Sequence, residues 1–188
     1  MNILYPRIPV NRLAFMVRMA FLGAVVAGPY GAVHDQISYA ISPEYFTKLK
    51  FRQFSYADFG WPPRLFAAEV GFLATWWVGL LAGWLLARAG LAELPLPAWR
   101  KAAVKAFGIV LVVAALSGFI GALLGFAASR NSDLSGWSDM QQTLDIADLR
   151  AFIIVAYLHA AGYLGALIGL VSAIVYVRRC LPRTRSYK

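Results

Sequence analysis

The chain has 188 residues, of which 60% are hydrophobic and only 14% are charged, and its mean hydropathy is +0.62. This composition lies outside the range of soluble globular proteins and predicts an integral membrane protein. The net charge of +9 fits basic loops beside anionic lipid headgroups, so we expect membrane lipids and no nucleic acid as partners.

Four runs with few or no charged residues are long enough to cross a hydrocarbon core of about 30 Å at about 1.5 Å per residue. They cover residues 13–33, 65–87, 102–128 and 151–177, with loops at 34–64 and 129–150. We therefore expect residues 1–188 to form one all-α domain, a four-span helical bundle. The first run is the least regular, because it contains Arg18 and the Gly28-Pro29 pair, which is the clearest break in the apolar segments.

The loop after the first run begins HDQISYAISPEYFTKLKFRQF, residues 34–54, and is rich in polar and aromatic side chains. Ser42-Pro43-Glu44 favours a helix start, with a serine cap, a proline in the first turn and an acid at the positive end of the helix dipole. We expect a short helix along the membrane surface, with the rings of Tyr45 and Phe46 at headgroup depth. Alternation in KLKFR, residues 48–52, would equally suit a strand.

This segment, together with the preceding GPYGAV of residues 28–33, resembles a motif in uncharacterised bacterial multipass membrane proteins. The resemblance covers residues 28–51 and is consistent with the four-span plan. It implies a bacterial membrane location and brings no activity with it.

Small residues recur four apart in all four runs. The patterns are GAVVA at 23–27, GLLAG at 79–83, GFIGALLG at 118–125 and GYLGALIG at 162–169. Such faces let helix backbones approach closely in lipid, so they predict a tightly packed bundle. They also suggest that the chain consists of two duplicated helical hairpins. Small-residue faces that are not used within the chain could bind a second copy of it or another subunit of a membrane complex.

The basic residues predict the topology, because lysine and arginine near span ends stay on the cytoplasmic side. Twelve lie on the side of both termini: Arg7, Arg12, Arg18, Arg88, Arg100, Lys101, Lys105, Arg178, Arg179, Arg183, Arg185 and Lys188. The other six lie in or beside the loops 34–64 and 129–150. We expect both termini in the cytoplasm, a multi-pass location in the inner (plasma) membrane, and no intramolecular disulfide, since Cys180 is the single cysteine.

Five residues near the extracytoplasmic half are candidates for chemistry: His34, Asp35, Glu69, Ser117 and His159. Two histidines and two acids could bind one metal ion, although their spacing has no recognisable signature and nothing in the sequence requires a cofactor. Ser117 and His159 lie at similar depths and superficially resemble the serine and histidine helices of rhomboid proteases. Rhomboids, however, have six spans and begin their serine helix at the serine.

Three classes of function remain open. The first is a non-enzymatic binding or assembly protein that recognises a lipid, an envelope component or a partner subunit through its extracytoplasmic loop. The second is a small transporter or proton conductor that uses Glu69 and His159, and the third is a membrane-embedded enzyme. The candidate ligand-binding residues are His34, Asp35, Tyr39, Glu44, Tyr45, Lys48, Arg52, Glu69 and His159.

Overall fold

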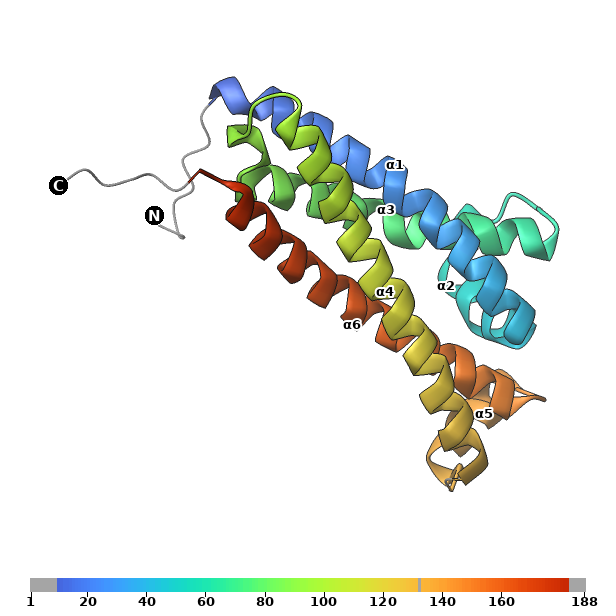
Figure 1. Ribbon diagram of the computed structural model, residues 1–188. Helices are drawn as coiled ribbons and strands as arrows, with labels where there is room; N and C mark the ends of the chain where they lie inside the picture. Colours follow the sequence, from blue (N-terminus) through green and yellow to red (C-terminus); the bar gives the residue numbers. More distant parts are fainter. Residues whose placement is uncertain (1–9, 132, 183–188) are drawn as a thin grey trace.

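The computed structural model describes residues 10–131 and 133–182. Four long helices form the molecule (Figure 1): α1 (Val10–Ile41), α3 (Pro63–Ala89), α4 (Ala98–Asn131) and α6 (Leu149–Cys180). Each is long and apolar enough to cross a membrane. This confirms the expected all-helical architecture with four apolar helices. Of the basic residues used to predict the topology, Arg7, Arg183, Arg185 and Lys188 lie outside the described residues.

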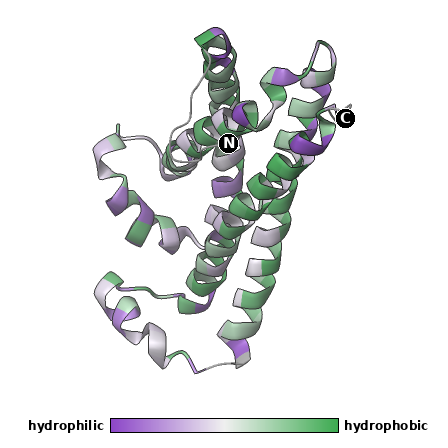
Figure 2. Ribbon diagram, turned by 90° about the vertical axis from the view of Figure 1, so that its left-hand side faces the viewer, coloured by the Kyte–Doolittle hydropathy of each residue, from purple (hydrophilic) through white to green (hydrophobic). Residues whose placement is uncertain are grey.

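Short elements connect the long helices. The π-helix η1 (Tyr45–Lys50), α2 (Phe51–Gln53) and the 3₁₀ turn η2 (Ser55–Ala57) follow α1. The turn η3 (Leu91–Glu93) joins α3 to α4, and η4 (Ser135–Trp137) and α5 (Ser138–Leu144) precede α6. Hydrophilic residues lie mainly in these connections and near the helix ends, whereas the long helices are mostly hydrophobic (Figure 2). This distribution suits helices that cross a hydrocarbon layer.

The long helices pack as two antiparallel pairs, α1 with α3 and α4 with α6, and make few contacts between the pairs. Glycines bring the helices of each pair together. A Cβ on Gly79 would overlap the carbonyl oxygen of Gly23, and one on Gly121 would lie 2.5 Å from the Cβ of Ala161. The small-residue faces therefore hold each hairpin together, and Gly79 and Gly121 are not free to contact a second copy of the chain.

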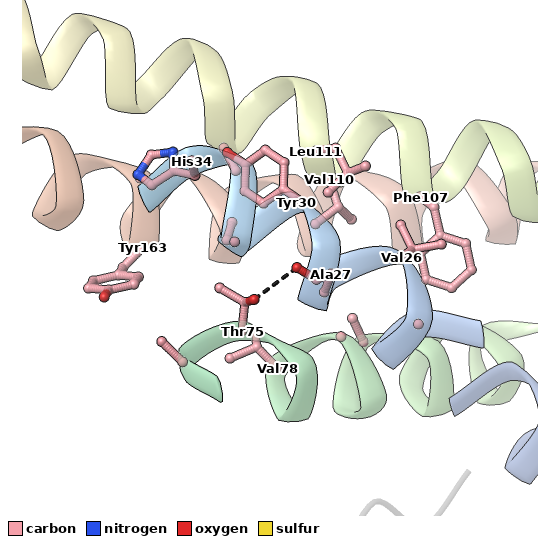
Figure 3. Close-up of a pocket in the computed structure, with 18 of the residues that line it drawn as sticks. Val26, Ala27, Tyr30, His34, Thr75, Val78, Phe107, Val110, Leu111 and Tyr163 are labelled. Atoms are coloured by element: carbon pink, nitrogen blue, oxygen red, sulfur yellow. Dashed lines mark hydrogen bonds between the residues drawn. The ribbon is translucent and has the colours of Figure 1, made fainter. Parts of the chain in front are cut away.

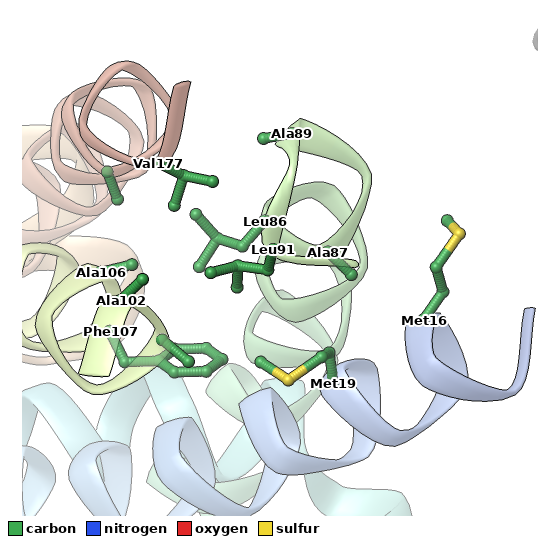
Figure 4. Packing of buried hydrophobic residues seen from close by; sticks show 12 residues of the cluster. Met16, Met19, Leu86, Ala87, Ala89, Leu91, Ala102, Ala106, Phe107 and Val177 are labelled. Atoms are coloured by element: carbon green, nitrogen blue, oxygen red, sulfur yellow. The ribbon is translucent and has the colours of Figure 1, made fainter. Parts of the chain in front are cut away.

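Two apolar clusters join the hairpins, one near each end. Near the start of α1 and the end of α6, Met19, Leu86, Leu91, Phe107 and Val177 pack together (Figure 4). Near the opposite end, a second cluster combines η1, α3 and α6. It contains Tyr45, Phe46, Ala67, Phe152 and Ile153. A cavity lined by residues of all four long helices lies between the two hairpins.

Helix α1 differs from the expectation in two ways. It continues through Pro29, where a break was expected, and it runs to Ile41 rather than ending near Val33. Neighbouring helices tolerate a proline within a membrane helix, and here Phe72 of α3 packs against Gly28. His34, Asp35 and Ser38 consequently lie on a regular helix, and successive turns place them towards one side of it.

Candidate functional site

The most polar group of buried side chains lies where α1 approaches α6. His34 and Asp35 of α1 and His159 of α6 each offer a ligand atom, and these atoms all lie within 4.8 Å of one another. His159 Nε2 is 3.8 Å from Asp35 Oδ1 and 3.2 Å from the hydroxyl of Ser38. Asp35 and His159 are each only 4% exposed. The fold thus brings together three ionisable candidates that are widely separated in the sequence.

Aromatic rings enclose His159. The ring of Tyr45 is stacked on it, with 5.0 Å between centroids and 23° between planes. His34 and Tyr163 approach it edge-on, at centroid distances of 5.1 and 6.1 Å. Tyr45 is 7% exposed and Phe46 is fully buried. These two rings were expected at the membrane surface, but η1 packs its aromatic face against α6, so they belong to the core.

The segment that carries these rings is bound to the start of α6 by polar contacts. The Glu44 carboxylate accepts the backbone N–H groups of Ala147 and Asp148, at 3.0 and 2.7 Å. Lys48 Nζ lies 3.0 Å from the carboxylate of Asp145. Glu44 and Lys48, which the sequence suggested as ligand-binding residues, therefore already have partners within the chain. The segment from 43 to 53 covers the polar cluster.

The other two aromatic or basic residues suggested for recognition lie further from the cluster. Tyr39 is partly buried, and the Arg64 guanidinium lies 5.5 Å from the centroid of its ring. Arg52 is exposed. Neither residue contributes to the group formed by His34, Asp35 and His159.

A cavity of about 100 Å³ begins at the polar cluster and extends between the two hairpins. His34 and Tyr163 lie at one end of it and Val26 and Phe107 at the other (Figure 3). Most of its wall consists of glycine, alanine and valine residues from all four long helices. The walls are therefore apolar, and the polar groups are concentrated at one end.

A second, larger space of about 490 Å³ adjoins the first between α3 and α6. The two spaces share the lining residues Ala74, Val78, Ala82, Val110, Tyr163 and Ala166. Its walls also include Trp77 and Leu167, which are 51% and 60% exposed. Because these exposed side chains lie on long apolar helices, the space is a groove that opens at the side of the bundle.

Lys50 and Phe54 also line this groove. Burial lowers the pKa of Lys50 below its ordinary value, and the negative charge of Asp35 opposes that shift. Burial, followed by the negative charges of Tyr163 and Asp35 when ionised, raises the pKa of Tyr45. The Tyr45 hydroxyl therefore stays neutral, whereas poor solvation disfavours the charged form of Lys50 and the Asp35 carboxylate favours it.

Comparison with known proteins leaves the family open. No protein-family model, curated protein or solved structure matches the chain. The roles of the site residues therefore follow from their geometry and chemistry.

Two sequence candidates lie outside the cluster. Glu69 is partly buried on α3, and its Oε2 has no hydrogen-bond partner among the residues that the structure describes. Ser117 packs against Gly165, about 9 Å along α6 from His159 at 1.5 Å per residue. The hydroxyl beside His159 is instead that of Ser38, so the arrangement suggested for Ser117 and His159 is not formed.

Sequence reasoning missed Ser38, Lys50 and Tyr163 as site residues. The i, i+4 spacing of His34 and Ser38 was a usable signal, but only for a helix that continues past residue 33. Lys50 and Tyr163 carried no local signal, because the groove they share is made by residues from different parts of the chain.

Proposed function

We propose that the protein binds one anionic, lipid-like amphiphile between its two hairpins. The observation that carries this proposal is the form of the joined cavity and groove: apolar walls, a sideways opening, and charged or polar groups at one end. A groove of about 490 Å³ falls within the usual 300–1,000 Å³ of ligand sites. An acyl chain suits the walls, and a headgroup suits the polar end.

The charge of Lys50 supports an anionic headgroup. A partly buried ammonium group is stabilised by nearby anions. Lys50 lines the groove, where an anionic headgroup would add to the stabilising charge of Asp35. The Tyr163 hydroxyl lines the same space and can donate a hydrogen bond to a phosphate or carboxylate oxygen. Recognition therefore combines one charge, one hydroxyl and an apolar channel.

This proposal keeps the expected binding function but moves its site. The loop surface was the expected site, yet Tyr45, Phe46, Glu44 and Lys48 are engaged in contacts within the chain. The segment that they form is better suited to cover the headgroup end of the cavity. The expected membrane setting also belongs to this proposal: an inner-membrane protein with both termini in the cytoplasm, self-associated or part of a larger complex.

Native mass spectrometry of protein released from bilayers of phosphatidylcholine and phosphatidylglycerol tests the proposal. We expect one retained lipid per chain, enriched in the anionic species. Ala74→Leu, which fills the space shared by the cavity and groove, should abolish retention. Lys50→Met should remove the preference for the anionic lipid.

Ala115→Leu is the matched control, because Ala115 lies on the exposed side of α4. It should retain lipid as the unmodified protein does. Equal retention by Ala74→Leu and Ala115→Leu, in folded proteins, would overturn the proposal.

A further inference from the structure

The cluster of His34, Asp35 and His159 has the composition of a metal site. Its ligand atoms all lie within 4.8 Å of one another. Ligand atoms lie about 2.0–2.2 Å from a tetrahedral transition-metal ion, which places any two of them about 3.4 Å apart. Side-chain rotations that bring the most distant pair closer by about 1.4 Å would therefore place all three atoms on one ion.

We propose that His34, Asp35 and His159 bind a single divalent transition-metal ion. Two imidazoles and one carboxylate suit zinc, iron or cobalt, whereas magnesium and calcium prefer sites made of oxygen ligands. With neutral imidazoles, the carboxylate leaves one net positive charge on the site. Metal binding here does not require the proposed amphiphile, because all three ligands come from the chain.

The surroundings of Asp35 favour this inference over a simple polar contact. Asp35 is 4% exposed, and its one basic neighbour within 4.0 Å among the described residues is His159, at 3.8 Å. That distance is longer than a hydrogen bond. A buried carboxylate that lacks close donors is strongly unfavourable in its charged form. A metal ion between Asp35 and the two imidazoles would place a positive charge in direct contact with the carboxylate, whereas Lys50 acts on it from beyond 4.0 Å.

The contacts around the imidazoles hold them in place as ligands. Tyr45 is stacked on His159, and the ring of Tyr30 lies 5.8 Å from that of His34. The Ser38 hydroxyl lies 3.2 Å from His159 Nε2 and 3.2 Å from the carbonyl oxygen of His34. Nε2 is also the nitrogen that faces Asp35, so a metal bound there would replace the Ser38 contact, and the hydroxyl would keep the His34 carbonyl as its partner. The aromatic cover also limits access of water from the side of η1.

Three protein ligands leave the ion with at least one open position, as in catalytic zinc sites. All three residues also line the cavity between the hairpins, so the open position faces that space. The positive charge of Lys50 acts on Asp35 and favours an anion over a second cation beside the metal. The fourth ligand of the ion is therefore exchangeable, and water or an anionic group completes the coordination.

The experiment uses full-length protein in detergent, purified without a histidine tag and stripped with a chelator. Zinc binding is measured by calorimetry and by the metal-to-protein ratio after gel filtration, and cobalt binding by its visible absorption. We expect one equivalent of either metal. Loss of a group that orients a ligand costs about 10–100-fold in metal affinity, so His34→Gln and His159→Gln should each weaken binding at least about 100-fold.

Asp58→Asn and Glu69→Gln are the controls. Asp58 is an exposed loop acid, and Glu69 is a partly buried acid outside the cluster. Both variants should bind zinc as the unmodified protein does. Failure of the unmodified protein to bind a stoichiometric metal would overturn the proposal, as would unchanged affinity in His34→Gln and His159→Gln.

His34→Cys keeps the test decisive if the glutamine variants do not fold. It retains a metal ligand of a different kind, so its cobalt complex should gain a sulfur-to-metal charge-transfer band. A folded His34→Cys protein that binds cobalt without this band would show that residue 34 is not a ligand. Lipid retention is measured separately on the same preparations, so failure of metal binding is distinguishable from failure of amphiphile binding.

Discussion

Replacing Gly79 by alanine tests the packing that holds the first hairpin together. An ideal Cβ on Gly79 would lie 2.7 Å from the carbonyl carbon of Gly23, whereas ordinary contacts begin near 3.4 Å. The carbonyl oxygen is closer still, so α1 and α3 must separate by at least about 0.7 Å. The hydroxyl of Thr75 donates a hydrogen bond to the carbonyl of Ala27 at 2.8 Å across the same contact (Figure 3). Separation of the helices would lengthen this hydrogen bond as well.

The expected loss follows from two opposing effects. Overpacking a close contact costs about 1–3 kcal/mol, and alanine recovers up to about 1 kcal/mol because it is a better helix former than glycine. Gly79→Ala should therefore lower the free energy of unfolding by up to about 2 kcal/mol. The assay is reversible unfolding in mixed micelles, followed by circular dichroism.

Gly108→Ala is the matched control for this measurement. Gly108 lies in α4, and a Cβ there would meet nothing within 4 Å. The control should be neutral or more stable by up to about 1 kcal/mol. Equal effects of the two substitutions would refute the idea that close backbone contact at Gly79 stabilises the hairpin.

Three further predictions concern the cover segment, the groove and the topology. Glu44→Gln should destabilise the fold by about 1–2 kcal/mol, since the amide group keeps one acceptor oxygen for an uncharged hydrogen bond and turns an N–H donor towards the second backbone N–H. Lys48→Met should change stability by less than about 1 kcal/mol, because its ion-pair partner Asp145 is exposed. In thermal unfolding, Glu44→Gln should be less stable than Lys48→Met, and the reverse ranking would contradict the structural role assigned to Glu44. The lowered pKa of Lys50 means that the unfolded chain binds more protons between the folded pKa and the ordinary value of 10.5. The free energy of unfolding should therefore rise with pH in that window. Lys50→Met should remove this rise and stabilise the protein at neutral pH. If the variant keeps the pH profile of the unmodified protein, the burial of the ammonium group is contradicted. Cysteines at the exposed positions Tyr56 and Asp139, in a background without the native cysteine, should react with an impermeant maleimide in intact cells, and labelling only after lysis would reverse the assigned topology.

The four helices and the use of their small-residue faces could be predicted from the sequence for a simple physical reason. Long apolar runs can satisfy their backbone groups in lipid only as helices. Small residues four apart in each run mark the faces on which those helices approach. The close contacts of Gly23 with Gly79 and of Gly121 with Ala161 lie on these faces.

The end of α1 and the burial of η1 could not be predicted in the same way. Polar residues after Val33 suggested a loop, because a helix facing lipid would not carry them. In the structure they face protein, and Asp35 and Ser38 are buried. Tyr45 and Phe46 suggested a surface helix because lysines lie beside them. Their burial depends on α6, which lies about a hundred residues further along the chain and leaves no mark on the local pattern.

The local pairing of the helices has a consequence for how the protein is made. Contacts between α1 and α3 involve only residues up to Ala89, so the first hairpin can insert and pack before the second has been synthesised. At that stage His34 and Asp35 lie in the first hairpin without His159 beside them. Only when α6 arrives do His159 and the amides that bind Glu44 become available. The cavity therefore forms only after α6 has packed. An insertion arrested after the first hairpin would leave His34 and Asp35 without His159.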